Sequence, residues 1–459
     1  MLSIRQGIRR LSATALLLGV VGGFTACDLD ELLEVSDRDT VNPSTLEDPE
    51  VLQIVVNGAM GDFVDAFASN DDYLIVSALI ADEFISAGTF TTRTATDRRN
   101  QFQPDDGNTS DQPYVNLHQA RRSLKEAARK VEENEGTGDA RYAELKALEG
   151  YTYLMLGEGW CPGVPLSTVE PSGERVEDGP NTGVELFNAA VAAFDAALAA
   201  SSGYELALIG KGRAQVNLGQ HAAAASTVST VADDYNYFVY HSVSGIDNPV
   251  FDLQSNGRYS VADVEGQNGL PFISAADPRV PVSDGGVGFD PAVPLWLADK
   301  YSGSDAPTPL ASGLEARLIE AEAALQADDY AGMTTILNGL RQQVETLMGA
   351  QIVDYADKVE APTLPDLTAP TTRAAAVDML FYERGFWLYL TGHRLGDLRR
   401  LIVQYGQAKE ATYPTGEYHK GGSYGDDAVF PLDFDETNNS LFVEAGGLDL
   451  CVVEDPGFS

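Results

Sequence analysis

The stretch LALIGKGRAQVNLGQHAAAASTVSTV, residues 206–231, has the residue spacing of a helix-turn-helix unit of the tetratricopeptide type. In such a unit, small residues let two helices approach closely, while larger apolar residues fill the groove between them. The stretch therefore predicts a pair of closely packed helices. The residues at the diagnostic positions are Gly212, Gly219, Ala224, Val228 and Val231.

Two other segments carry the same register. In the first, 318–340, the matching residues are Ala321, Ala324, Tyr330, Leu337 and Leu340. The second is split, because 147–157 supplies its first helix, 187–200 supplies its second, and the Pro- and Gly-rich insert 158–181 separates them. Generic helix packing would produce part of this pattern, but three copies in one register favour a helical-repeat scaffold.

The rest of the chain divides by composition. Repeat-like helices are predicted over about 51–235 and 313–405, including a strong last helix at 374–405. Between them, 236–312 is rich in Gly, Pro, Asp and aromatic residues and predicts at most short strands. The segment 88–113, rich in Thr, Asp and Gly, predicts a long loop. The fold class is thus mainly α, a tetratricopeptide-like scaffold with a long irregular region, and such regions usually carry function or cap a scaffold.

The N-terminus predicts export and a lipid anchor. Three arginines precede the apolar run LSATALLLGVVGGF, which is too short for a stable bilayer-spanning helix and is followed by Thr-Ala-Cys. This pattern indicates a lipoprotein signal peptide over 1–26, acylation of Cys27 by palmitate-type chains, and a polar tether over 27–50 before the folded body at 51–459. An ordinary signal peptide with a chance cysteine is the alternative. In an oxidising export compartment, the two remaining cysteines, Cys161 and Cys451, are able to pair.

Net charge excludes some partners. The chain has 69 Asp+Glu against 30 Lys+Arg, which gives a formal charge of -39. Such an excess repels nucleic acid phosphates and anionic lipid headgroups, so neither is predicted as a ligand. The charge indicates a solvated surface that favours solubility and neutral or cationic partners.

The sequence offers no positive sign of an enzyme. It has no nucleophile elbow, phosphate loop, dinucleotide fingerprint or zinc-protease helix motif, and its five histidines are scattered without metal-ligand spacing. The segment DFDET, 433–437, could offer oxygen ligands to a structural calcium ion, but it lacks the spaced acids and the glycine of a calcium loop, so a solvated acidic turn is favoured. No cofactor is predicted. Paired carboxylates for glycoside hydrolysis stay open, because their separation is not visible in a sequence.

The segment ERGFWLYLTGHRLGDLRRL, 383–401, gathers charge on a predicted helix. His393 and Asp397 lie one turn apart, and Arg394 and Asp397 are three residues apart, close enough to pair. A catalytic site would need a nucleophile or a carbonyl pocket nearby, and the sequence offers neither. Because unpaired burial of a charge is costly, we interpret these residues as part of the frame, paired with each other or with buried backbone carbonyls.

The same segment resembles the signature helix of the SusD/RagB family of outer-membrane nutrient-uptake lipoproteins, in which Glu-Arg, Gly-His-Arg and Asp-Leu-Arg-Arg recur in that order. The signature residues are Glu383, Arg384, His393, Arg394, Asp397 and Arg399. Other segments agree with the family in the same order along the chain: 33–63, 145–167, DPRV (277–280), LIEAEAAL (318–325), LNGLR (337–341) and VFPLDFDETNNS (429–440). Gly396, where an aromatic residue is common, and the strongly acidic body depart from the family pattern and bear on the ligand more than on the fold.

The resemblance implies a scaffold of four tetratricopeptide-like units in a lipoprotein of the bacterial outer membrane, anchored by its lipid and exposed at the cell surface. It also implies a partner, a SusC-like TonB-dependent transporter, over whose mouth the lipoprotein acts as a lid. Family members capture oligosaccharides or, in some cases, peptides and do not cleave them. Two alternatives remain: a scaffold lipoprotein of the tetratricopeptide type that binds only proteins, and an exported glycoside hydrolase.

Sugars are held by aromatic faces and a few polar groups in loops on a rigid frame, so the candidate ligand contacts lie in the two irregular segments. No family motif fixes these positions, and each of them is also a candidate for the core. The candidates are Phe90, Arg93 and Phe102 in 88–113, and Tyr259, Phe272, Phe289 and Trp296 in 236–312.

Overall fold

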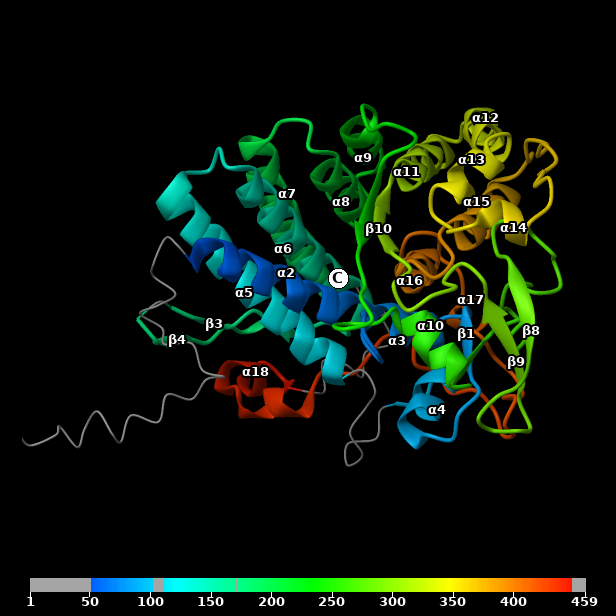
Figure 1. Ribbon diagram of the computed structural model, residues 1–459, viewed down its shortest axis with the longest axis horizontal. Coiled ribbons are helices and arrows are strands. Elements are labelled where there is room, and N and C mark those ends of the chain that lie inside the picture. The colour runs from blue at the N-terminus through cyan, green and yellow to red at the C-terminus, as the bar shows by residue number, and fades with distance from the viewer. Residues whose placement is uncertain (1–50, 102–110, 171, 448–459) are drawn as a thin grey trace, which may run out of the picture. The chain divides into compact units, whose positions relative to one another are not determined.

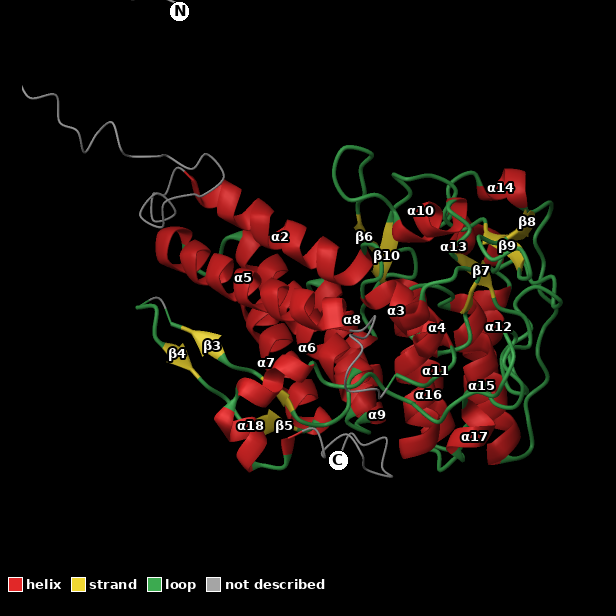
Figure 2. Cartoon of the chain, turned by 90° about the horizontal axis from the view of Figure 1, so that it is seen from below, coloured by secondary structure: helices red, strands yellow, loops and turns green. Residues whose placement is uncertain are grey.

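The computed structural model describes residues 51–101, 111–170 and 172–447. Helices dominate this part of the chain, and the strands are short (Figures 1 and 2). The signal peptide, Cys27, the tether, Phe102 and Cys451 lie outside the described residues, so the predictions on them stay predictions. Cys161 is buried and disulfide-bonded, and its pairing with Cys451 likewise stays a prediction.

The helices are α2 Leu52–Ala68, α3 Tyr73–Ile80, α4 Thr91–Asp97, α5 Asp111–Glu135, α6 Ala140–Gly159, α7 Gly183–Ala200, α8 Glu205–Asn217, α9 His221–Val228, α10 Pro249–Ser255, α11 Gly313–Gln326, α12 Tyr330–Arg341, α13 Val344–Gly349, α14 Tyr355–Lys358, α15 Arg373–Trp387, α16 Arg394–Val403, α17 Lys409–Thr412, the 3₁₀ helix η2 Phe434–Asn438 and α18 Ser440–Glu444. The strands are β1 Phe84–Ser86, β2 Val164–Pro165, β3 Thr168–Val169, β4 Arg175–Val176, β5 Pro180–Asn181, β6 Asn236–Val239, β7 Tyr259–Val261, β8 Val282–Val287, β9 Pro294–Ala298 and β10 Thr308–Ser312.

The predicted repeats are present as helix pairs. Successive helices pack against each other, α5 on α6, α6 on α7, α7 on α8 and α8 on α9, and the stack continues through α11 to α12 and α15 (Figure 1). The three predicted copies correspond to the pairs α8–α9, α11–α12 and α6–α7, the last of them separated by β2–β5. The mainly α, tetratricopeptide-like fold class is therefore confirmed.

Glycines set the spacing of these helices. A Cβ on Gly210 would lie 2.3 Å from the Phe194 ring, and one on Gly150 would lie 2.7 Å from the same ring. A Cβ on Gly212 would lie 2.5 Å from Val228, its predicted partner across the repeat. Because each contact is too short for any real side chain, α6, α7, α8 and α9 can approach this closely only where the sequence has glycine.

Local signals fix where the repeat helices begin. Thr182 and Glu185 form a reciprocal capping box at the start of α7. The side chains of Asp139, Ser312 and Thr372 cap α6, α11 and α15 by accepting backbone N–H groups that have no partner within the helix. Among the described helices, α7 is the one long and apolar enough to cross a membrane, and it packs against α6 and α8.

The irregular region 236–312 is held by small antiparallel sheets. β6 pairs with β10, β8 pairs with β9, and β7 pairs with β1, so that Phe84 lies opposite Val261. The β1–β7 pair joins the segment after α3 to residues far along the chain. The prediction of an unbroken loop over 88–113 is wrong, since Thr91–Asp97 form the helix α4.

The predicted last helix, 374–405, is two helices. α15 ends at Trp387 and α16 begins at Arg394, and between them Leu390 and Gly392 have positive φ angles of 51° and 73°. Three buried side chains hold this break. Lys300 donates to the Tyr389 carbonyl (2.8 Å), Tyr301 donates to the Leu390 carbonyl (2.7 Å), and Glu83 accepts from the Leu390 N–H (2.7 Å). Backbone groups that a helix would satisfy internally are thus satisfied by distant segments.

Candidate functional site

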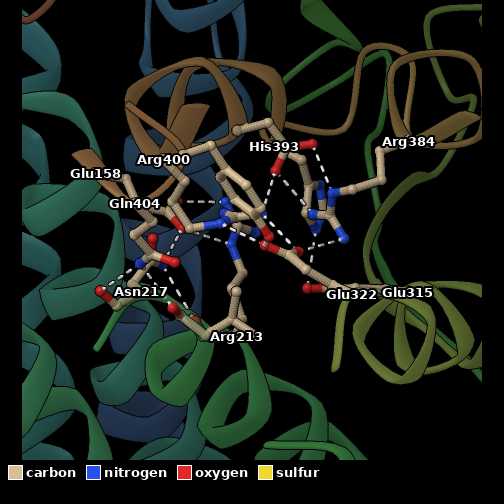
Figure 3. Close-up of polar contacts among 12 residues, drawn as sticks. Glu158, Arg213, Asn217, Glu315, Glu322, Arg384, His393, Arg400 and Gln404 are labelled. Carbon is tan, nitrogen blue, oxygen red and sulfur yellow. Dashed lines mark hydrogen bonds and ion pairs between the residues drawn. The ribbon is translucent and has the colours of Figure 1, made fainter. Parts of the chain in front are cut away.

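The charged residues of the signature segment are buried, each with at most 5% of its surface exposed. They come from α15, α16 and the break between these helices, and Figure 3 shows Arg384, His393 and Arg400 among charged residues of α6, α8 and α11. Because buried charges need partners, the first question is how each one is matched.

Asp397 is matched by two arginines. Arg384 donates two hydrogen bonds to its carboxylate (2.8 Å each), and Arg400 donates a third (2.9 Å). Burial raises the pKa of Asp397, but these two guanidinium groups outweigh burial and hold it well below its usual range. Arg394, which is close enough in sequence to pair with Asp397, instead reaches away from its own helix to Asp82, with contacts of 2.6 and 2.7 Å.

Arg399 ties α16 to α6. One terminal nitrogen of its guanidinium donates to the carbonyls of Gly157 (2.9 Å), Glu158 (2.6 Å) and Trp160 (3.1 Å). These carbonyls lie at the C-terminus of α6, where a helix leaves carbonyls unpaired and its dipole favours a positive charge. A fixed cation from the last long helix therefore closes a repeat helix that lies far away in sequence.

Glu383 joins three sequence motifs. It accepts from Arg279 of the DPRV segment (2.7 Å), from Arg341 of the LNGLR segment (2.5 Å) and from the indole N–H of Trp387 (3.1 Å). A single carboxylate thus binds arginines from two short motifs that lie far apart along the chain.

His393 completes the network. Its Nε2 lies 3.1 Å from a carboxylate oxygen of Glu315, and burial together with Arg213 lowers its pKa below the ordinary value, while Glu315 opposes this shift. Arg213 in turn pairs with Glu158 and donates to the Gly392 carbonyl (2.8 Å). Every charged signature residue has a partner within the described part of the chain, as the interpretation of this segment as frame requires.

A different arrangement of arginine occurs at the irregular segments. Phe90, at the N-terminus of α4, is 50% exposed, and Phe289, just after β8, is 55% exposed. The Arg258 guanidinium lies over both rings, 3.9 Å from the Phe289 centroid and 5.2 Å from the Phe90 centroid. We call Phe90, Arg93, Arg258 and Phe289 the aromatic–arginine cluster.

Ion pairs and hydrogen bonds hold the cluster and helix α4 in place. Arg93, the fourth member, lies 4.7 Å from the Phe90 centroid and forms an ion pair with Asp71. Asp71 also accepts a hydrogen bond from the Tyr259 hydroxyl (2.6 Å), next to Arg258 in sequence. At the other end of α4, Asp97 accepts from the Ser86 N–H (2.8 Å) and the Tyr418 hydroxyl (2.6 Å). α4 is thus fixed at both ends.

The structure sorts the seven predicted ligand contacts. Phe90, Arg93 and Phe289 meet in the cluster, although Phe289 follows the other two by about two hundred residues. The prediction is wrong for Phe272 and Tyr259, whose side chains have no exposed surface, because Phe272 packs on Phe386 and Tyr389, and Tyr259 packs on Phe84.

Two predicted contacts stay undecided, and one cluster residue was missed. Trp296 is partly buried against the main core, so its contact with a ligand stays a prediction, as does that of Phe102, which lies outside the described residues. Sequence reasoning missed Arg258. The one available signal was an arginine beside an aromatic residue in a glycine-containing stretch, NGRY, which is too common to single it out.

No metal centre is evident. Within the described ranges, no group of three or more His, Cys, Asp or Glu side chains could hold a metal ion. The acidic segment considered for calcium forms η2, where the Asp433 side chain accepts the backbone N–H of Asp435 (2.8 Å), and Glu436 accepts from the Tyr114 hydroxyl (2.9 Å). These contacts are those of a capped turn.

The fold and the cluster together define a class of protein: a helical-repeat scaffold, fixed by buried ion pairs, that presents exposed aromatic and cationic side chains on inserted loops. Solved structures place the fold more closely. A SusD superfamily protein from Bacteroides thetaiotaomicron has a TM-score of 0.61 at 15% identity, covering 86% of this chain and 98% of that one. A SusD-like carbohydrate binding protein from Bacteroides vulgatus has a TM-score of 0.60 at 13% identity, covering 87% and 98%.

A laminarin binding SusD-like protein is similar as well, with a TM-score of 0.58 at 15% identity, covering 86% of this chain and 98% of that one. No protein-family model matches the chain, and no curated protein matches it by sequence. The protein has the SusD fold, as the resemblance implied.

Proposed function

We propose that this protein is a non-enzymatic SusD/RagB-type lipoprotein that captures an oligosaccharide at the aromatic–arginine cluster. It delivers the oligosaccharide to a SusC-like TonB-dependent transporter of the outer membrane, to which it is held by acylated Cys27. The SusD fold supports this proposal, as do the names of two similar structures, which describe a carbohydrate binding and a laminarin binding protein.

One observation carries the choice of site. Phe90 and Phe289 are large aromatic side chains, each at least half exposed, that two separate loops bring onto one guanidinium group. Exposure of two such rings is unfavourable in water unless something covers them. The apolar C–H face of a sugar ring packs well on an aromatic face, and a rigid frame below keeps the rings in place.

The buried frame argues against catalysis by the signature residues. Asp397, Glu383 and His393 are buried and each has a charged partner, which supports a structural role for them. Binding without cleavage therefore fits the charged helix better than glycoside hydrolysis. A peptide ligand and a purely protein-binding scaffold remain the competing functions.

Titration calorimetry with a panel of oligosaccharides and peptides tests the proposal. We expect the wild-type protein to bind an oligosaccharide and Phe289→Ala to bind it at least tenfold more weakly, because a stacking face is lost. Phe434→Ala is the matched control, since this phenylalanine is 60% exposed on η2, outside the cluster. Binding of peptides alone, or turnover of a glycan by the purified protein, would contradict the proposal.

A further inference from the structure

The charge of Arg258 has no counterpart within the described residues. Its side chain makes contact with two aromatic rings, and no carboxylate or carbonyl oxygen there accepts a hydrogen bond from it. Two other described arginines, Arg122 and Arg175, likewise show no such acceptor, but both are exposed at the surface, where water solvates them. Arg258 is partly buried. The two rings therefore hold it in place, and its guanidinium has no acceptor among the described residues.

The surroundings of Arg258 add to this excess. Arg93 pairs with Asp71, and Lys420 pairs with Asp290 (3.6 Å), the residue after Phe289. Among the described residues, two of the three cations named here are thus paired with carboxylates, and the charge of Arg258 is left unmatched. The whole chain has the opposite balance, with a formal charge of -39. A cationic excess beside two half-exposed aromatic rings requires a specific explanation.

Stacking prepares a guanidinium group for an anion. A guanidinium that lies flat on a ring has its N–H groups directed outward in the plane, as a rigid fork that matches a carboxylate or a sulfate. Little side-chain entropy is then lost on binding, because the rings already fix the arginine. Repulsion from the distant acidic surface is weak at physiological salt, since charges separated by more than about 8 Å are largely screened.

We infer that the oligosaccharide is acidic: its sugar rings stack on Phe90 and Phe289, while a carboxylate or sulfate group on the sugar pairs with Arg258. This inference rests on the proposed function and names the class of its ligand. It reverses, at this one site, the preference for neutral or cationic partners that the net charge predicts for the whole surface.

The test is calorimetry at physiological salt with matched pairs of glycans. Oligogalacturonate and alginate oligosaccharides are compared with the neutral chains made from them by reduction of their carboxylates. Sulfated galactan oligosaccharides are compared with their desulfated forms, which separates sulfate from carboxylate as the anion. Laminarin, xylan, mannan and starch oligosaccharides supply the neutral set.

Three variants complete the design. Arg258→Gln removes the charge, and Arg258→Lys keeps the charge without the planar fork. Arg122→Gln makes the same charge change on the exposed face of α5, away from the cluster, and is expected to leave binding unchanged. Circular dichroism checks that each variant is folded.

We expect the best ligand to be an acidic chain that binds at least tenfold more tightly than its neutral counterpart. We expect Arg258→Gln to bring the ratio of acidic to neutral glycan affinity close to one. We expect Arg258→Lys to give a ratio between those of Arg258→Gln and the wild type. A neutral glycan that binds as well as any acidic one would overturn the inference while the proposed function stands. Failure to bind any glycan would overturn both.

Discussion

Arg384 and Arg258 are the same residue type in opposite surroundings. The guanidinium of Arg384 is buried and donates a double hydrogen bond to Asp397, whereas that of Arg258 lies on two half-exposed rings with its donors unused. The first arrangement fixes one helix against another, and the second leaves binding capacity at the surface. In this chain, the matching of a charge separates frame from site better than the kind of residue does.

The frame explains why its motifs look like a site in the sequence. Buried ion pairs need good geometry and complete matching, and several residues that form them here lie in one short motif, 383–401, while most of their partners lie in distant segments. Arg399, which is held by three carbonyls at the end of α6, and Glu383, which binds two arginines, are examples. A charged cluster in a sequence therefore indicates buried partners at least as strongly as it indicates chemistry.

The largest effect is expected from Asp397→Ala. Without this carboxylate, Arg384 and Arg400 lose their shared acceptor inside the protein, so the free energy of unfolding should fall by about 3–5 kcal/mol. Urea unfolding followed by circular dichroism measures the change. Asp378→Ala is the control, since Asp378 is exposed on the neighbouring face of α15 and its loss should change stability by less than about 0.5 kcal/mol.

The distinction between frame and site would be contradicted if Asp397→Ala were as stable as the wild type but no longer bound the oligosaccharide. Asp397 would then belong to the site, and burial and matching would no longer mark the frame.

The next effect concerns pH. Burial raises the pKa of Asp72 to about 7, with Asp65 and Asp71 contributing in the same direction and hydrogen bonds from Ser69 and Asn116 opposing it. The folded state therefore binds a proton that the unfolded chain releases at an ordinary aspartate pKa near 3.8. It follows that the stability contributed by this group falls as pH rises from about 4 to about 7.

Asp72→Asn removes this titration while keeping the shape of the protonated group. Relative to wild type, the free energy of unfolding of the variant should gain roughly 2–4 kcal/mol between acidic pH and pH 8. Urea unfolding at a series of pH values measures the difference. If the free energy of unfolding changed with pH in the same way for both proteins, Asp72 would be ionised in the folded state, and the prediction would be wrong.

Sequence reasoning reached the scaffold because its signals are local. The spacing of small and apolar residues in 206–231 depends on neighbours within a few turns of helix. The break at Leu390 was not predictable, because a leucine with a positive φ angle is held there by Glu83, Lys300 and Tyr301 from distant segments.

The sequence predicted only part of the candidate site, because the rest of the site depends on contacts between distant segments. Loop aromatics were the right residue type, but their exposure depends on tertiary contacts: Tyr259 lies in the β1–β7 pair and is buried, whereas Phe289 is 55% exposed. Arg258 has no distinguishing pattern in the sequence. The role proposed for Arg258 rests on the lack of a hydrogen-bond acceptor among the described residues. A three-dimensional structure is needed to see this.

The smallest effect is expected at Arg93, which lies between the two extremes, since it is in the cluster but paired with Asp71. Asp71→Asn removes this ion pair, keeps an acceptor for Tyr259, and tolerates the positive φ angle of 63° at this position. We expect a loss of about 0.5–1 kcal/mol in stability, as for other partly exposed pairs. Because Arg93 is then free to bind an anion, the ratio of acidic to neutral glycan affinity should rise about two- to threefold, an effect of roughly 0.5 kcal/mol. If calorimetry gave a lower ratio instead, Asp71 would be positioning Arg93 for the ligand, and a matched charge would belong to the site after all.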